Sequence, residues 1–322
     1  MKAIRVAKFG PPEVMTLEDV PDLVPAAGQV LVQLKAAGVN PVDTYIRAGS
    51  YAQLPTPPYT PGFDGAGTVE RVGAGVTHFT PGQRVYLARS LTGTYAQQAL
   101  CEPHQVHPLP DRVSFEQGAG VWIAYGTAYR ALITRAAARA HDWVLVHGAS
   151  GGVGTASVQL ARSLGMRVIG TAGTREGREH VLAQGALHAL DHTSPAYLDE
   201  IRRITSYPSG GVDVVLEMLA NLNLDNDLGV LAMGGRVVVI GNRGSIEINP
   251  RQTMARDSSI LGMSLLHARE AEILRLAAAI GAGLENGSLT PVVGAVLPLA
   301  GAREAHAKVL APGSRGKIVL KV

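Results

Sequence analysis

Three glycines at three-residue intervals give the sequence its clearest chemical signal. They lie in the segment His147-Gly148-Ala149-Ser150-Gly151-Gly152-Val153-Gly154, between an apolar run and the apolar stretch 156–164. At a strand-to-helix turn, such glycines let the chain turn tightly, let a pyrophosphate approach the backbone, and let helix and strand pack closely. The N–H groups at the start of the helix then face the phosphates. The segment therefore predicts dinucleotide contacts from Gly148, Ser150, Gly151, Gly152 and Val153.

The residues after the next apolar run favour one of the two nicotinamide cofactors. An NAD-dependent enzyme usually has a carboxylate there, which binds the ribose 2′-hydroxyl. Here Gly173 and Thr174 are followed by Arg175 and Arg178. Guanidinium groups pair with a 2′-phosphate. We therefore expect NADPH, bound near Gly173, Arg175 and Arg178; the sequence leaves open which arginine meets the phosphate.

A parallel sheet is needed to position these residues. Beyond position 143, apolar runs rich in Val, Ile and Leu alternate with helical segments, as in strands buried on both faces. Six such strands with helical crossovers form a doubly wound Rossmann sheet, whose ligands bind at the carboxyl ends of the strands. The predicted strands are 143–147, 167–172, 186–190, 212–216, 236–240 and 259–265.

The rest of the chain reads as β structure that ends in a helical segment. Short alternating runs separated by Gly/Pro turns predict a partly open β-barrel. Ser114 and Gln117 have the spacing of a capping box, which begins a helical stretch to about 138. A long helix over 269–285 then returns the chain to the barrel. The predicted barrel strands include 29–35, 66–72, 84–88, 95–100 and 317–322.

The bulk composition indicates a globular protein with two domains. The chain has 322 residues, a formal charge of +3 and one cysteine, Cys101. A length of this order exceeds one ordinary core, and one cysteine allows no internal disulfide. No dense run of Lys and Arg calls for a nucleic-acid partner, and no apolar run is long enough to span a bilayer. We expect a cytoplasmic protein without a membrane partner.

Five motifs together resemble the zinc-free quinone oxidoreductases of the zeta-crystallin type, a branch of the medium-chain dehydrogenase/reductase superfamily. The resemblance extends over essentially the whole chain. It implies a GroES-like catalytic domain, residues 1–124 and 266–322, and an inserted Rossmann NADP-binding domain, residues 125–265. The motifs are 37–45 (AGVNPVDTY), 61–67 (PGFDGAG), 146–154 (VHGASGGVG), 217–221 (EMLAN) and 246–251 (IEINPR).

The resemblance also implies that no metal is bound. Zinc alcohol dehydrogenases of this superfamily have a catalytic cysteine at the position of Asn40, and Gly-His-Glu where this chain has Gly62-Phe63-Asp64. A phenylalanine provides no zinc ligand. Their structural zinc has four cysteines. The spacing Cys101-x-x-His104-x-x-His107 is metal-like, but prolines interrupt it and we interpret it as loop.

The same resemblance assigns the remaining site residues. It places Tyr45 beside the nicotinamide, as a hydrogen-bond or proton donor, although a core tyrosine is the alternative. Asn40 is expected to shape the cleft loop and to donate a hydrogen bond to the substrate oxygen. His147 is more simply a hydrogen-bonded, partly buried histidine than a base. Further cofactor contacts are expected at strand ends, from His192, Asn221, Ile240, Gly241, Asn242, Arg243, Leu261, Gly262 and Met263.

The predicted reaction is reduction of a quinone by NADPH through direct hydride transfer, without metal or flavin. The sequence leaves open whether the overall outcome for the quinone is two-electron or one-electron reduction. An electron-poor quinone accepts hydride without a Lewis acid, so the protein binds, orients and excludes water. Reduction of α,β-unsaturated carbonyl or enoyl substrates is the alternative enzyme. A nucleotide-bound protein that binds RNA and turns over little is the alternative from another class. The apolar strand 259–265 at a sheet edge predicts a homodimer or homotetramer.

Overall fold

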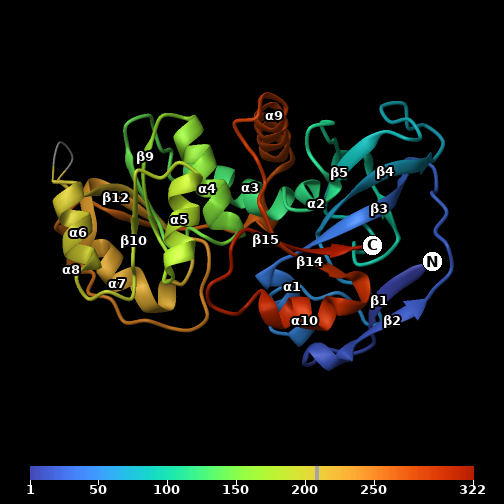
Figure 1. Ribbon diagram of the computed structural model, residues 1–322, viewed down its shortest axis with the longest axis horizontal. Coiled ribbons are helices and arrows are strands. Elements are labelled where there is room, and N and C mark those ends of the chain that lie inside the picture. Colours follow the sequence, from blue (N-terminus) through green and yellow to red (C-terminus); the bar gives the residue numbers. More distant parts are fainter. Residues whose placement is uncertain (207–209) are drawn as a thin grey trace. The chain divides into compact units, whose positions relative to one another are not determined.

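The computed structural model describes residues 1–206 and 210–322, which fold as two compact units (Figure 1). The first consists of Met1–Ile123 and Gly281–Val322, and the second of Ala124–Ile280. The second unit is inserted in the first, as the sequence predicts. Its C-terminal boundary lies inside helix α9 (Glu270–Asn286), beyond the predicted position 265.

A six-stranded parallel sheet forms the second unit, in the order β10-β9-β8-β11-β12-β13. This order confirms the predicted doubly wound fold. All four residues of β8 are buried, because helices cover both faces of the sheet. The strands are β8 (Trp143–Val146), β9 (Arg167–Thr171), β10 (His188–Leu190), β11 (Val212–Glu217), β12 (Leu231–Val239) and β13 (Ser259–Gly262). The helices between them are α4 (Gly152–Ser163), α5 (Arg175–Ala183), α6 (Tyr197–Ile204), α7 (Ala220–Val230) and α8 (Arg251–Met254).

The sheet of the first unit is open and centred on the ten-residue strand β3 (Val30–Val39). One edge of β3 pairs with β4. The other edge pairs with β6 over Val30–Gln33 and with β15 over 36–39. One strand with two partners along one edge curves the sheet into the predicted partly open barrel. The other strands are β4 (Asp64–Val72), β5 (Arg84–Ala88), β6 (Gln98–Cys101), β7 (Val106–Pro108), β14 (Val293–Pro298) and β15 (Lys317–Lys321), with a separate pair β1 (Lys2–Val6) and β2 (Met15–Asp19).

The helical stretch that begins at Ser114 is not continuous. Ser114 caps α2 (Phe115–Gly118) as predicted: its Oγ accepts from Gln117 N at 3.1 Å, and its N–H donates to Gln117 Oε1 at 3.0 Å. After a turn, α3 (Trp122–Tyr129) runs into a wider π-helical segment, Arg130–Arg135.

Two short helices of the first unit lie outside the predicted pattern. They are α1 (Pro41–Ala48) and α10 (Ala302–Lys308). Each is about two turns long, too short for an apolar period to stand out. In the part of the chain that the structure describes, no helix combines the length and apolarity needed to cross a bilayer.

Candidate functional site

The glycine segment forms the predicted turn between β8 and α4. Gly148 has φ +57°, a left-handed conformation that favours glycine. A Cβ on Gly154 would lie 2.4 Å from the Gly148 carbonyl oxygen and 2.5 Å from Ala149 Cα, so only glycine lets the helix start this close to the strand. A Cβ on Gly151 would meet only the Gly148 oxygen, at 3.5 Å. The turn therefore has the open, exposed backbone that a pyrophosphate needs.

The two predicted arginines differ in their surroundings. The Arg178 guanidinium donates to Asp191 Oδ2 at 2.7 Å and to the Ala172 carbonyl at 3.3 Å. The Arg175 side chain is 78% exposed, and its ion pair with Glu179 is long, at 3.4 Å. Surface pairs of this kind are weak and separate easily. Arg175 therefore has the more accessible of the two guanidinium groups.

Strand-end residues that the sequence separates widely lie together in the second unit. His192 Nε2 would be 3.1 Å from a Cβ on Gly173, so the His192 ring lies close against this backbone. Asn221 Oδ1 accepts from Arg243 N at 2.9 Å, which joins the loops after β11 and β12. The Asn242 amide donates to the Gly244 carbonyl at 2.6 Å and so shapes its own loop.

The same two loops are held close by backbone contacts. Ala220 N donates to the Gly241 carbonyl at 3.0 Å, and a Cβ on Gly241 would lie 2.2 Å from the Met218 oxygen. Ile240 N donates to the Glu217 carbonyl at 2.9 Å. The predicted contacts after β9, β10, β11 and β12 thus lie at the carboxyl ends of the strands, where open α/β sheets bind ligands.

The residues predicted from the sixth strand lie on an edge strand. Leu261 and Gly262 pair with β12, and Met263 N donates to the Val239 carbonyl at 3.1 Å. The Gly262 carbonyl accepts from Arg135 Nε at 3.0 Å. Their contribution to a cofactor site stays a prediction.

A buried group of ionisable side chains lies beside the carboxyl ends of β8 and β11. The sequence patterns do not reveal it. His147 Nε2 lies 2.8 Å from Asp227 Oδ1 and 3.5 Å from Glu217 Oε2. Burial and the charge of the Asp227 carboxylate raise the pKa of Glu217 to about 7, although the charge of His147 lowers it. Burial alone would lower the pKa of His147, but the hydrogen bond and charge of Asp227, with the charge of Glu217, raise it. The sequence predicts a hydrogen-bonded histidine at His147. Its partners lie 70 and 80 residues further along the chain, so no local motif identifies them.

In this His147–Glu217–Asp227 group, one nitrogen or oxygen atom of each side chain lies within 4.8 Å of those of the other two. The 2.8 Å contact between His147 and Asp227 is an ordinary hydrogen-bond length, and a proton satisfies it. The Cys101-x-x-His104-x-x-His107 residues diverge: His104 pairs with Glu102 at the surface, and His107 stacks on Trp122 with ring centroids 5.8 Å apart.

In the first unit, Asn40 is held by a buried ion pair. Lys317 Nζ lies 2.9 Å from Asp64 Oδ2 and donates to Asn40 Oδ1 at 2.5 Å. Asn40 Nδ2 donates to Asp64 Oδ2 at 3.1 Å, and Ile123 N donates to Asp64 Oδ1 at 2.9 Å. The Asn40 residue is only 3% exposed. Its amide has internal partners at both atoms, which favours a structural role over the predicted contact with substrate.

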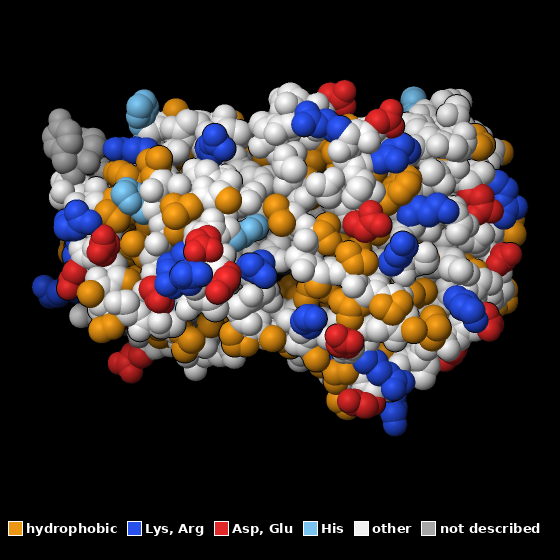
Figure 2. Space-filling model, viewed as in Figure 1, with side chains coloured by type: hydrophobic (Ala, Val, Ile, Leu, Met, Phe, Trp, Pro, Cys, Tyr) orange, Lys and Arg blue, Asp and Glu red, His pale blue; other side chains and the backbone are white. Residues whose placement is uncertain are grey.

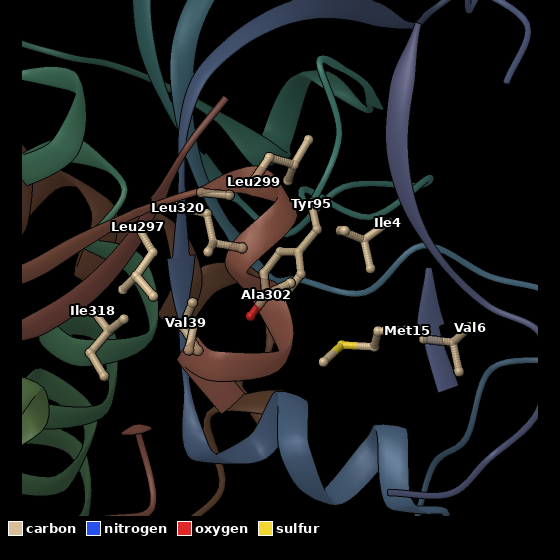
Figure 3. Close-up of a cluster of buried hydrophobic side chains, with 12 residues drawn as sticks. Ile4, Val6, Met15, Val39, Tyr95, Leu297, Leu299, Ala302, Ile318 and Leu320 are labelled. Atoms are coloured by element: carbon tan, nitrogen blue, oxygen red, sulfur yellow. The ribbon is translucent and has the colours of Figure 1, made fainter. Parts of the chain in front are cut away.

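Helix α1 carries Tyr45 outward and Asp43 inward. The backbone N–H of Asn40 donates to Asp43 Oδ2 at 2.8 Å, which caps the helix. Tyr95 OH donates to the same oxygen at 3.2 Å and contacts His306 Nε2 at 3.2 Å. Figure 3 shows the Tyr95 ring among apolar side chains, including Ala302, in the core of this unit. Burial raises the pKa of Asp43 to about 7, whereas burial and the charge of Arg47 lower the pKa of His306 to about 3.

Tyr45 is half-buried, and its hydroxyl has no hydrogen-bond partner in residues 1–206 and 210–322. Its backbone carbonyl accepts from Ser50, which fixes the C-terminal end of α1. A tyrosine packed into the core normally finds a partner for its hydroxyl. This observation disfavours the core alternative and leaves the hydroxyl available to a ligand.

Comparisons with known proteins agree with this geometry. Residues 152–279 match the zinc-binding dehydrogenase family, and residues 26–111 match the alcohol dehydrogenase GroES-like domain. The chain is 48% identical over 322 residues to a quinone oxidoreductase of Homo sapiens, across 99% of this chain and 97% of that protein. The solved structure of an Escherichia coli quinone oxidoreductase complexed with NADPH is 28% identical, with a TM-score of 0.89 over 100% of both chains. That of an NAD-dependent alcohol dehydrogenase is 31% identical, with a TM-score of 0.92 over 100% of both. The chain belongs to the quinone oxidoreductase family of the zeta-crystallin type, within the medium-chain dehydrogenase/reductase superfamily.

Proposed function

We propose that the protein is an NADPH-dependent reductase of quinones that uses neither metal nor flavin. The observation that supports this proposal most directly is the glycine turn after β8. It lies with the loops after β9 to β12 at the carboxyl ends of the parallel strands. The names of its relatives, a human quinone oxidoreductase and an NADPH-bound bacterial one, support the substrate class and the cofactor. A second structural neighbour is NAD-dependent, so the choice of cofactor needs its own argument.

The loop after β9 supplies that argument. Its backbone passes through Gly173, and no carboxylate precedes α5 to bind a ribose 2′-hydroxyl. The Thr174 side chain caps α5 by accepting from Gly177 N, and Arg175 follows at the first helical position. A helix N-terminus and an exposed guanidinium together favour a phosphate. We therefore assign the 2′-phosphate to Arg175, and Arg178 to holding the loop through Asp191.

Bound NADPH supplies the hydride, and the protein binds and orients the reactants. We assign the pyrophosphate to the N–H groups of 150–153. Tyr45 OH donates a hydrogen bond, or a proton, to the oxygen on which negative charge develops. Asn40 is a positioning residue in this scheme, because its amide is occupied by Lys317 and Asp64. Quinones are electron-poor, so hydride transfer to them requires no Lewis acid.

A steady-state assay tests the function directly. The purified protein is incubated with a chelator and then assayed for NADPH oxidation with 1,2- and 1,4-quinones, with NADH in parallel. We expect turnover that prefers NADPH and is unchanged by the chelator. Loss of turnover after chelation would contradict the metal-free mechanism. NADPH binding without quinone turnover would transfer the proposal to α,β-unsaturated carbonyl or enoyl substrates, which the same assay measures.

The surface gives little support to the RNA-binding alternative. Basic and acidic side chains are interspersed over the face that Figure 2 shows, and no continuous basic stripe crosses it. Nucleic-acid binding relies on clustered Lys and Arg that release counterions from the phosphates. A titration with single-stranded RNA at several salt concentrations tests this, and we expect only weak binding at low salt.

We also propose that the protein is a homodimer that pairs through β13. This strand hydrogen-bonds to β12 on one side and lies at the edge of the sheet. Its residue Ile260 is 37% exposed, and an exposed apolar edge strand promotes pairing with a second copy. Light scattering measures the assembly. We expect a dimer or a tetramer made of two dimers, and a charged substitution at Ile260 should release monomers.

A further inference from the structure

The His147–Glu217–Asp227 group lies where four structural elements meet below the proposed dinucleotide site. His147 directly follows β8, Glu217 ends β11 and Asp227 lies on α7. Thr171, the last residue of β9, has its Oγ1 3.4 Å from His147 Nδ1. Because these elements carry the loops proposed to bind the cofactor, a change in this group reaches all of those loops.

Contacts of Glu217 transmit its position to the neighbouring loops. Its Oε1 accepts from Leu219 N and, at 3.2 Å, from Asn223 Nδ2 at the start of α7. Its backbone carbonyl accepts from Ile240 N at 2.9 Å and Gly241 N at 3.2 Å. Glu217 thus fixes both the loop after β11 and the loop after β12, while His147 adjoins the glycine turn.

Two carboxyl oxygens of this cluster receive no hydrogen bond from the residues that the structure describes. Glu217 and Asp227 are completely buried, and Glu217 Oε2 and Asp227 Oδ2 have no hydrogen-bond partner in the described part of the chain. Two buried carboxylates beside each other repel, and an unpaired buried charge is costly. A proton shared between Glu217 and Asp227, whose carboxyl groups interact electrostatically, leaves only one of the two buried carboxyl groups charged. The cluster, with His147 protonated, is then neutral; loss of the shared proton gives it a net charge of −1.

We propose that His147, Asp227 and Glu217 are positioning residues for the dinucleotide, which they hold tightly only while Glu217 carries a proton. The inference rests on the proposed cofactor site. A net negative charge directly below the glycine turn opposes the binding of a pyrophosphate. The neutral form also keeps the Leu219 and Asn223 contacts without repulsion from Asp227. The affinity for the dinucleotide therefore falls as the pH rises through the ionisation of Glu217.

Other charged groups around the cluster do not provide the same response. Tyr197 of α6 interacts electrostatically with both carboxylates, but the pKa of its hydroxyl is raised above 10 and it stays neutral. His192 interacts with His147, and Arg178 and Asp191 interact with His192. Arg178 and Asp191 form an ion pair at 2.7 Å, and hydrogen bonds from Thr193 lower the pKa of Asp191. The pKa of His192 is lowered, so that histidine is already neutral where Glu217 ionises.

Calorimetric titration of NADP⁺, which is stable in acid, tests the inference between about pH 6 and about pH 8.5. The 2′-phosphate itself titrates near pH 6, so the wild-type profile is compared with that of E217Q. A glutamine is neutral and has the shape of protonated glutamate. We expect the wild-type affinity to fall by about three- to tenfold more than that of E217Q over this range. Y125F is the matched control, because it removes the buried hydrogen bond from Tyr125 OH to Gln159 Oε1 in the same unit.

A second measurement detects the proton on Glu217 directly, in protein without added cofactor. The infrared spectrum of the wild type at pH 6 should contain a protonated-carboxyl band from Glu217 that E217Q lacks, beside a band from Asp43 that E217Q keeps. The Glu217 band should disappear as NADP⁺ affinity falls, and Y125F should keep it. Equal pH profiles for wild type and E217Q, or no band that E217Q removes from the wild-type spectrum, would overturn the inference. Failure of the wild type to bind NADP⁺ at any pH would instead overturn the proposed cofactor site.

Discussion

Lys317 and Asn40 are joined by a hydrogen bond of 2.5 Å, although 277 residues separate them in the chain. The same ammonium lies 2.9 Å from Asp64, and all three side chains are buried. This contact ties the last strand of the first unit to the start of α1, the helix that carries Tyr45. The chemistry proposed for Tyr45 thus depends on a strand far along the chain.

Removal of the ammonium should destabilise the protein. K317M leaves the Asp64 carboxylate buried without its partner, and we expect a loss of about 3–5 kcal/mol in the free energy of unfolding. Urea denaturation measures it. K321A changes an exposed lysine at the other end of β15 and should alter the stability by less than about 0.5 kcal/mol. Equal effects of the two variants would show that the ion pair contributes nothing.

Substitution of Arg175 and substitution of Arg178 should affect the preference for NADPH over NADH differently. R175A removes the guanidinium assigned to the 2′-phosphate, so the KM for NADPH should rise by about 10- to 100-fold while the KM for NADH changes little. R178A releases Asp191 and disturbs the loop, so it should affect both cofactors alike. A larger loss of NADPH preference in R178A would reverse the assignment.

The glycine turn allows a sharp steric test. In G154A the new Cβ would lie 2.4 Å from the Gly148 oxygen, and the backbone must move to admit it. We expect a large loss of NADP⁺ affinity by calorimetry, together with a lower melting temperature. G281A is the control: it lies within α9, and its Cβ would meet nothing within 4 Å. That substitution should raise stability by about 0.5–1 kcal/mol, because alanine favours a helix more than glycine does.

Asp43 should make stability fall between about pH 4 and about pH 7. Its pKa is raised from 3.8 to about 7 in the folded protein, so the native state binds a proton that the unfolded state releases. The stabilisation is complete below the unfolded value and is lost as the pH rises through the folded one. His306 opposes this, because its pKa is lowered from 6.5 to about 3 and its stabilisation grows with pH.

D43N isolates the contribution of Asp43. The stability of D43N should increase steadily relative to that of the wild type as the pH rises from about 4 to about 7, because only the wild type loses the stabilisation from the Asp43 proton. The difference between the two unfolding curves, measured in urea at several pH values, gives the effect. H306Q is the complementary variant and should change the slope in the other direction. A pH-independent difference between D43N and the wild type would contradict the assignment.

Tyr45 should affect turnover more than binding. Y45F removes the hydroxyl but keeps the ring, so kcat with quinones should fall by about 10- to 100-fold while the Kd for NADP⁺ stays within about twofold. Stopped-flow measurement of NADPH oxidation separates the chemical step from product release. Y129F, in the second unit, provides a tyrosine control that should leave kcat unchanged. An unchanged kcat in Y45F would exclude the hydroxyl from the reaction.

The sequence predicts the parallel sheet and the glycine turn well, because both depend on local signals. Continuous apolar strands and the Gly148–Gly154 spacing arise from short-range constraints on packing and backbone conformation. The curved β3 follows less directly, since two partners share one of its edges. Sequence patterns do not predict the buried polar groups. Nothing in the local sequence distinguishes Lys317 and Asp227 from surface charges, and only the fold shows their buried partners. Asn40 shows the same limit, because its family position suggested substrate while its contacts are internal.

The inserted arrangement of the units has a consequence for synthesis. The second unit is complete when the ribosome has passed Ile280, whereas β14 and β15, which belong to the first unit, are still to be made. Until β15 pairs with β3, the half of β3 that contains Ala37 lacks one neighbour and Asp64 lacks Lys317. Domains generally fold as units during translation. The nucleotide-binding half should therefore fold first, and a released chain truncated near 290 should already bind dinucleotide while its barrel remains open to proteases.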